Sequence, residues 1–120
     1  MPRTFVLAML GCLGIAVCHP AWADLDRHKP VYLVAHGRTA IVWRDYDAWL
    51  GGMLRRKMGD GPDKIVPLWS CVTKSGTKVV IVDMPTDEEA TIVVIDGDRA
   101  GCAGFTPAVY LSNDPAAQGP

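Results

Sequence analysis

The chain has 120 residues, with 12 Lys and Arg against 13 Asp and Glu, so its formal net charge is −1. This near-neutral balance argues against non-specific binding to nucleic acids and against a generally basic, membrane-adhering surface. The length is that of one small domain.

The first 23 residues have the three parts of a cleavable export signal. A basic start at Arg3 precedes an apolar stretch over residues 5–17, and a small residue, Ala23, stands where cleavage is expected. The apolar stretch has about 13 residues, whereas about 20 are needed to cross a bilayer. The sequence therefore predicts removal of residues 1–23 and a protein that is periplasmic or secreted.

Removal of the signal changes the charge and cysteine counts. Eleven basic residues then face thirteen acidic ones, for a net charge of −2, and Cys12 and Cys18 leave while Cys71 and Cys102 stay. A remaining pair in an oxidising compartment predicts a disulfide. Its loop spans 31 positions, for which the chain-entropy model gives about 3 to 4 kcal/mol of stabilisation. An uncleaved anchor, or lipidation of Cys12 or Cys18, fits the sequence less well.

The mature chain opens with two β-rich runs, 31–35 and 39–43, separated by His36, Gly37 and Arg38. Such runs around a short glycine-containing link predict a β-hairpin. His36 and Arg38 then lie at its turn. They form either part of an exposed site or, as is commoner, a solvated turn.

Residues 45–58 change to a helical period, with Asp45 suited to cap the start and Gly59 to end the helix. Gly51 and Gly52 cost about 1 kcal/mol each relative to alanine, unless close packing needs the missing side chains. We expect Tyr46, Trp49 and Leu50 to pack on a sheet and the basic residues 55–57 to form a solvated last turn; the alternative is a membrane-surface or partner-binding helix. The apolar positions are Tyr46, Trp49, Leu50, Met53, Leu54 and Met58.

A turn-rich break at 59–64 separates the helix from a second β-rich half. Short strands with turns at about ten-residue spacing predict a small antiparallel sheet or barrel, so the expected fold class is mainly β with one helix. We expect one exported domain over residues 24–111 and a flexible tail over 112–120. The strand-like runs are 65–72, 77–84, 91–95 and 102–111, with turns at 74–76 and 96–98.

Parts of residues 65–111 resemble the second half of a bacterial Src-homology-three-like (SH3-like) domain. In that family a glycine-threonine pair enters a hydrophobic strand, as at 76–82, and the next strand turns at a polar glycine tip, as at 91–97. A glycine-aromatic motif ending in tyrosine-leucine, here residues 104–111, then closes the barrel. The resemblance implies a small antiparallel SH3-like barrel or sheet, preceded here by the hairpin and the amphipathic helix.

The last motif is the most specific one. Gly104 allows a sharp entry, Phe105 can turn inward, Pro107 can begin a short helical turn, and Tyr110 returns to the sheet. In peptide-binding members of the family the matching proline and tyrosine line the ligand groove. The resemblance therefore implies Pro107 and Tyr110 as groove residues.

We predict a non-catalytic domain with no cofactor and no metal site. The mature chain has two histidines, His28 and His36, in neither catalytic nor zinc-ligand spacing, and it has no glycine-rich phosphate loop. Acidic residues from Asp83 to Glu89 would suit paired-carboxylate chemistry. We interpret them instead as a solvated loop.

The predicted function is that of an exported binding module for a peptide, a cell-wall component or an envelope protein partner. Its predicted ligand-binding residues are Tyr110, Pro107, Phe105 and Trp69, since tryptophan and tyrosine carry much of the energy at binding surfaces. We expect no nucleic-acid partner and membrane contact only through the signal peptide. The alternatives are a small exported inhibitor of a hydrolase such as a lysozyme, and an accessory subunit of an envelope complex. A shallow aromatic groove favours the module, a protruding loop beside the disulfide favours the inhibitor, and an apolar helix face favours the subunit.

Overall fold

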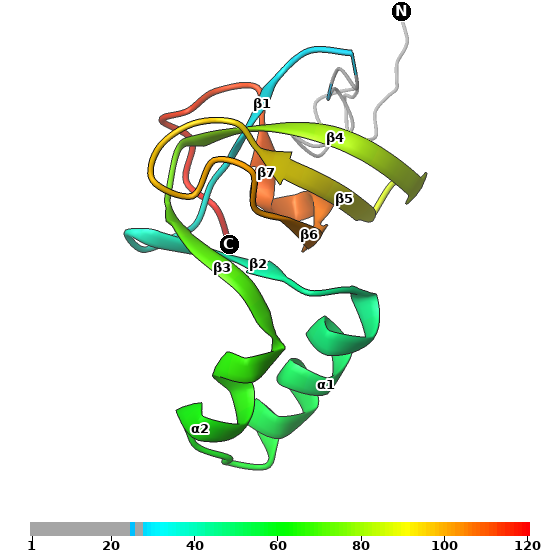
Figure 1. Cartoon of the computed structure of the whole chain (residues 1–120), viewed down its shortest axis with the longest axis vertical. Coiled ribbons are helices and arrows are strands. Elements are labelled where there is room, and N and C mark those ends of the chain that lie inside the picture. The colour runs from blue at the N-terminus through cyan, green and yellow to red at the C-terminus, as the bar shows by residue number, and fades with distance from the viewer. Residues whose placement is uncertain (1–24, 26–27) are drawn as a thin grey trace, which may run out of the picture.

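The computed structural model describes residue 25 and residues 28–120, and the predicted signal peptide lies outside this part of the chain. Within it, one antiparallel sheet of seven strands carries two short helices that project from it as an arm (Figure 1). The strands are β1 (Val31–Leu33), β2 (Thr39–Trp43), β3 (Trp69–Lys74), β4 (Thr77–Thr86), β5 (Glu89–Val94), β6 (Ala103–Pro107) and β7 (Leu111–Ser112). The helices are α1 (Tyr46–Lys57) and α2 (Pro62–Ile65), with 3-10 turns η3 (Val66–Leu68) and η4 (Ala108–Tyr110).

The strand order across the sheet is β3-β2-β6-β5-β4-β1-β7, and every neighbouring pair is antiparallel. The sheet is open, because β3 and β7 form its two ends. Alternate residues of its strands point to one side and build the main core. Its fully buried members include Val31, Leu33, Val42, Val79, Ile92, Val94 and Leu111.

The predicted hairpin between 31–35 and 39–43 is wrong. β1 pairs with β4 and β7, whereas β2 pairs with β3 and β6. The link between the two runs is instead held by distant partners, since the Val34 amide donates to the Tyr110 carbonyl at 2.7 Å and the Ala35 amide to Ser75 Oγ at 2.9 Å. Each run therefore satisfies its backbone groups on strands that lie far away in the sequence.

The strand predicted over 65–72 begins later, and the first part of it is helical. Residues 62–68 form α2 and η3, and β3 starts only at Trp69. Pro62 and Pro67 each stand in the first turn of one of these helices. A proline has no N–H for a strand ladder but fits the first turn of a helix, which explains the difference. The fold thus has two short helices where one was predicted.

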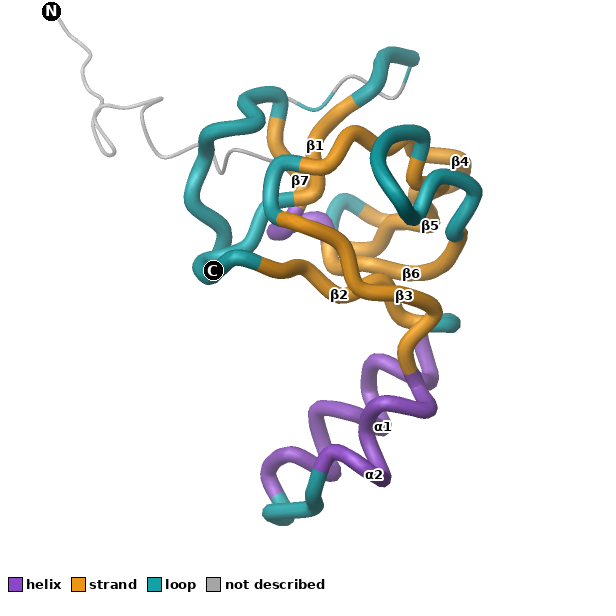
Figure 2. Tube along the Cα trace, turned by 60° about the vertical axis from the view of Figure 1, so that its left-hand side comes forward, coloured by secondary structure: helices purple, strands orange, loops and turns teal. Residues whose placement is uncertain are grey.

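Helix α1 follows the predicted boundaries. The Asp45 carboxylate accepts a hydrogen bond from the Ala48 amide at 2.7 Å, and Gly59 takes a positive φ of 79° just after the helix. Gly52 is needed for close packing, because a Cβ there would overlap the Trp43 ring, with Cη2 at 2.7 Å. Since β2 leads into α1 and η3 leads into β3, the helices extend the β2-β3 pair beyond the sheet (Figure 2). We call residues 46–68 the helical arm.

The second half of the chain follows the predicted order of strands and turns. Gly76 and Gly97 occupy the turns after β3 and β5 with positive φ angles of 92° and 75°. The predicted helical turn after Pro107 is present as η4, and Leu111 returns to the sheet in β7. Residues beyond β7 turn at Asp114, whose carbonyl accepts from the Ala117 amide, and the chain ends close to β2 (Figure 1).

Candidate functional site

A disulfide between Cys71 and Cys102 is present, as predicted, with a Cα–Cα distance of 6.5 Å. It ties β3 to the residue just before β6. Beside it, the Ser70 hydroxyl donates to the Ala103 carbonyl at 2.8 Å. The β2-β6 ladder has a single register pair, Trp43 opposite Phe105. The disulfide therefore adds a covalent link where the β2-β3 pair is joined to the rest of the sheet by few backbone contacts.

An aromatic cluster, which we call the aromatic junction, joins the helical arm to the sheet. Trp43 meets Trp69 edge to face with ring centroids 6.5 Å apart, and Phe105 lies 5.6 Å from Trp49 and 5.4 Å from Tyr46. Trp43 and Phe105 are 4% and 5% exposed. Such pairs contribute about 0.5 to 1.5 kcal/mol each beyond the area that they bury. The junction therefore packs the base of the arm against β2 and β6.

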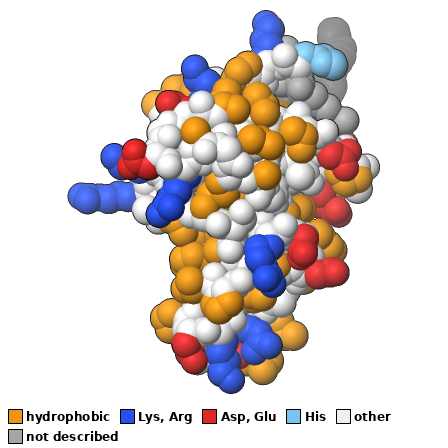
Figure 3. Space-filling view, in the orientation of Figure 1, with side chains coloured by type: hydrophobic (Ala, Val, Ile, Leu, Met, Phe, Trp, Pro, Cys, Tyr) orange, Lys and Arg blue, Asp and Glu red, His pale blue; other side chains and the backbone are white. Residues whose placement is uncertain are grey.

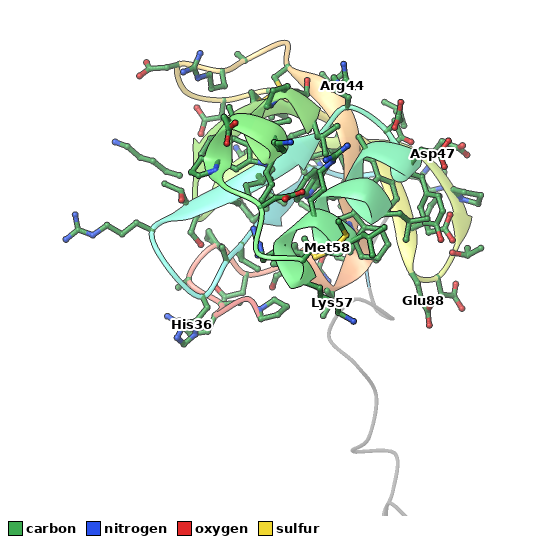
Figure 4. The ribbon with its side chains drawn as sticks, turned by 90° about the horizontal axis from the view of Figure 1, so that it is seen from below. His36, Arg44, Asp47, Lys57, Met58 and Glu88 are labelled. Atoms are coloured by element: carbon green, nitrogen blue, oxygen red, sulfur yellow. A yellow bond between two sulfur atoms is a disulfide. The ribbon has the colours of Figure 1, made fainter. Side chains whose placement is uncertain are left out.

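A groove of about 190 Å³ lies between the helical arm and η4. Its walls are the segment after β1, strand β2, the inner face of α1 and the side chain of Tyr110. His36 stands at its rim and lies at the outer edge of the molecule in Figure 4. The groove is lined by Ala35, His36, Gly37, Thr39, Ala40, Ile41, Trp43, Trp49, Met53, Arg56, Tyr110 and Pro120.

The lining of this groove is part apolar and part polar. Aromatic rings and the flexible Met53 side chain are among its apolar members, and Arg56 supplies a permanent positive charge. None of its lining residues, all in the described part of the chain, is an Asp or Glu. It is thus suited to an apolar side chain carried next to a carboxylate or to main-chain carbonyl groups.

The four predicted ligand-binding residues do not lie together. Tyr110 is half-buried and lines the groove. Pro107 is buried opposite Glu89 of β5, while Phe105 and Trp69 pack in the aromatic junction. The structure therefore brings Tyr110 to the groove and places the other three in positions that support the fold around it.

Apart from Tyr110, and from His36 at its exposed turn, the groove residues were not identified as site residues from the sequence. Trp49, Met53 and Arg56 lie at helical spacings of four and three, so they share the inner face of α1. Trp43 comes from β2, next to that face. The helical period of the sequence places Trp49, Met53 and Arg56 on one face of α1. Only the packing of the arm shows that this face meets Tyr110.

Comparison of the chain with protein-family models, with curated proteins and with solved structures found no match. None of the described helices is long and apolar enough to cross a membrane. Within residue 25 and residues 28–120, no group of three or more His, Cys, Asp or Glu side chains could hold a metal ion. What the structure defines is a small, mainly antiparallel β protein with a disulfide, a helical arm and an aromatic groove.

Proposed function

We propose that the protein is an exported, non-catalytic binding module whose groove takes a short peptide segment of an envelope partner. The observation that carries the proposal is the meeting of Tyr110 with Trp43, Trp49 and Arg56 around one open groove. These are the residue types that concentrate binding energy at protein surfaces.

The size of the groove narrows the ligand. Sites for drug-sized molecules have volumes of about 300 to 1,000 Å³, and this groove of about 190 Å³ is smaller. A peptide lying across it would insert one or two apolar side chains. Arg56 would bind a neighbouring carboxylate of the peptide through the bidentate hydrogen bonds that guanidinium groups favour.

An SH3-like fold for the second half of the chain forms part of the proposal. In its support, β4, β5 and β6 follow one another in the sheet, and a 3-10 turn carrying Tyr110 leads from β6 into β7. The open sheet and the helical arm inserted between β2 and β3 depart from the minimal domain. The arm supplies one wall of the groove, so its side chains help to determine which ligands the groove binds.

Selection from a displayed random peptide library tests the proposal, with the disulfide-bonded exported protein as the target. Selected peptides should quench or shift tryptophan fluorescence, because Trp43 and Trp49 line the groove. Tyr110→Ala should weaken their binding by at least about tenfold, in line with the loss of a hot-spot aromatic residue. Arg56→Gln should weaken the binding of acidic peptides selectively.

Matched variants separate binding from folding. Val109 is the exposed neighbour of Tyr110 in η4 and does not line the groove, so Val109→Ala should bind as the wild type does. Tyr110 also packs against the main core, and Tyr110→Phe keeps the ring in place if Tyr110→Ala is unstable. The proposal fails if no peptide is enriched, or if Tyr110→Ala and Arg56→Gln bind the selected peptides normally.

A second function, inhibition of a hydrolase, has one observation in its favour. Residues 95–101 form an exposed loop that ends beside Cys102 of the disulfide. A rigidly anchored loop is suited to enter an active site. A lysozyme assay tests this directly: inhibition that is lost in Arg99→Ala supports it, and full lysozyme activity in an excess of the protein rejects it.

A further inference from the structure

The outer face of α1 carries a stripe of exposed apolar side chains. Leu50, Leu54 and Met58 recur every four residues and are 43%, 59% and 65% exposed. They lie opposite Ala48 and Gly52, the buried residues of the helix. The expectation that Leu50 packs on the sheet is therefore wrong, whereas Tyr46 and Trp49 pack on Phe105 of β6. The helix extends past the sheet, so the cluster at its base is reached by Tyr46, Trp49, Gly52 and Met53 and not by the stripe.

This stripe ends at the tip of the helical arm, the part of the molecule farthest from the sheet in Figures 1 and 2. Lys57 and Met58 lie together at the end of α1 in Figure 4. Val66, in η3, adds another apolar side chain on the same arm that is almost half exposed. Figure 3 shows apolar and basic side chains side by side on the lower part of the molecule. The arm is thus a convex, amphipathic projection rather than a groove.

The tip is positively charged in an otherwise acidic protein. Residues 55–66 contain four basic side chains and two acidic ones, for a net charge of +2. The whole chain has a net charge of −1, so the remainder carries −3. Arg55 pairs with Asp60 at 3.4 Å, while Lys57 and Lys64 form no ion pair within the described residues. The net charge of +2 at the tip therefore comes from basic side chains without an ion-pair partner among the described residues, and this sum already includes Asp63, the neighbour of Lys64 in α2.

We propose that the tip of the helical arm docks on the surface of an anionic phospholipid bilayer. Leu54 and Met58 would enter the boundary between headgroups and acyl chains, while Lys57 and Lys64 reach the lipid phosphates. Long aliphatic side chains and lysines on one convex arm suit this arrangement, because lysine can bury its stem and keep its ammonium group at the headgroups. Anionic lipid is the partner whose charge complements the tip.

Self-association through the stripe, and docking on a protein subunit of an envelope complex, are the alternative occupants of this face. Neither would give binding to vesicles that depends on anionic lipid. The membrane proposal uses a surface separate from the peptide groove, because Leu54, Lys57 and Met58 do not line the groove. It departs from the expectation that only the signal peptide touches a membrane, and it takes up the membrane-surface alternative for this helix.

Vesicle cosedimentation of the processed, disulfide-bonded protein tests the proposal. The probes are vesicles of phosphatidylcholine alone and of phosphatidylcholine with an equal amount of phosphatidylglycerol. We expect binding to the anionic vesicles, little binding to the neutral ones, and weaker binding as salt is raised. The double variant Leu54→Ser/Met58→Ser should lower the partition coefficient at least about tenfold. Lys57→Glu/Lys64→Glu should lower it further, since each basic residue contributes about fivefold.

The control variants are matched in exposure and charge but lie outside the arm. Val82 of β4 is 56% exposed and Lys74 of β3 is exposed, so Val82→Ser and Lys74→Glu should bind vesicles as the wild type does. The proposal is overturned if the wild type does not bind anionic vesicles, or if the arm variants bind no more weakly than the controls. It is also overturned if sedimentation velocity shows a dimer that depends on Leu54 and Met58 without vesicle binding. Peptide binding in the groove should be unchanged in every arm variant.

Discussion

Gly51 and Gly52 are neighbours in α1, yet alanine at the two positions should have opposite effects on stability. From helix propensity alone, either change stabilises the helix by about 1 kcal/mol. At Gly51 the nearest atom to a new Cβ would be Leu68 Cδ1, at 4.0 Å, which is an ordinary contact. Gly51→Ala should therefore raise the free energy of unfolding by the full amount expected from helix propensity, about 1 kcal/mol. For a domain of this size it raises the melting temperature by about 4 to 8 °C.

At Gly52 the same methyl group would enter the ring of Trp43. That ring is buried and held by the edge of Trp69, so it has little room to move away. Overpacking of this kind costs about 1 to 3 kcal/mol. Gly52→Ala should therefore be about 1 to 3 kcal/mol less stable than Gly51→Ala, and no more stable than the wild type.

Urea and thermal unfolding followed by circular dichroism measure this difference between the two variants. Near-ultraviolet spectra would report any displacement of Trp43 in Gly52→Ala. Equal free energies of unfolding for the two variants would refute the packing of α1 on Trp43. A large destabilisation in Gly51→Ala would refute the open surroundings of that position.

Two further changes test the contributions of the disulfide and of the helix N-cap to stability. The disulfide closes a loop of 31 positions, so reduction, or Cys71→Ser with Cys102→Ser, should lower the free energy of unfolding by about 3 to 4 kcal/mol; an unchanged melting temperature in reducing agent would contradict this. Asp45→Ala removes the 2.7 Å bond to the Ala48 amide and should cost about 1 kcal/mol in urea unfolding. Asp45→Asn, which keeps an accepting oxygen, should lose much less, and equal losses in the two variants would exclude capping as the cause.

The groove shows why sequence patterns reached only part of the site. Tyr110 was identified because a local motif, from Gly104 to Leu111, carried its own turn and strand signals. Trp43 belongs to β2 and Trp49 to α1. The hydrophobic period of each element does not show which other element its side chains contact. The position of the two tryptophans beside Tyr110 depends on Gly52 and Gly104, where a Cβ would overlap the side chain or the backbone of Trp43.

The amino-acid sequence by itself determined the local features, which are stabilised by interactions between residues only a few positions apart. These include the capped helix after Asp45, the glycine turns at Gly76 and Gly97, and the 3-10 turn after Pro107. The disulfide was also determined, because removal of the predicted signal leaves a single pair of cysteines.

Only the tertiary structure decided which segments meet. The local pattern of residues 31–35 and 39–43 predicts a hairpin. In the structure β1 pairs with β4 and β7, and β2 pairs with β3 and β6. Pairing of strands depends on the sum of backbone bonds and side-chain burial over the whole sheet, which a local pattern does not contain. For the same reason, only the packed arm separates the inner face of α1 at Trp49 from the exposed face at Leu54. That separation creates both surfaces for which a function is proposed.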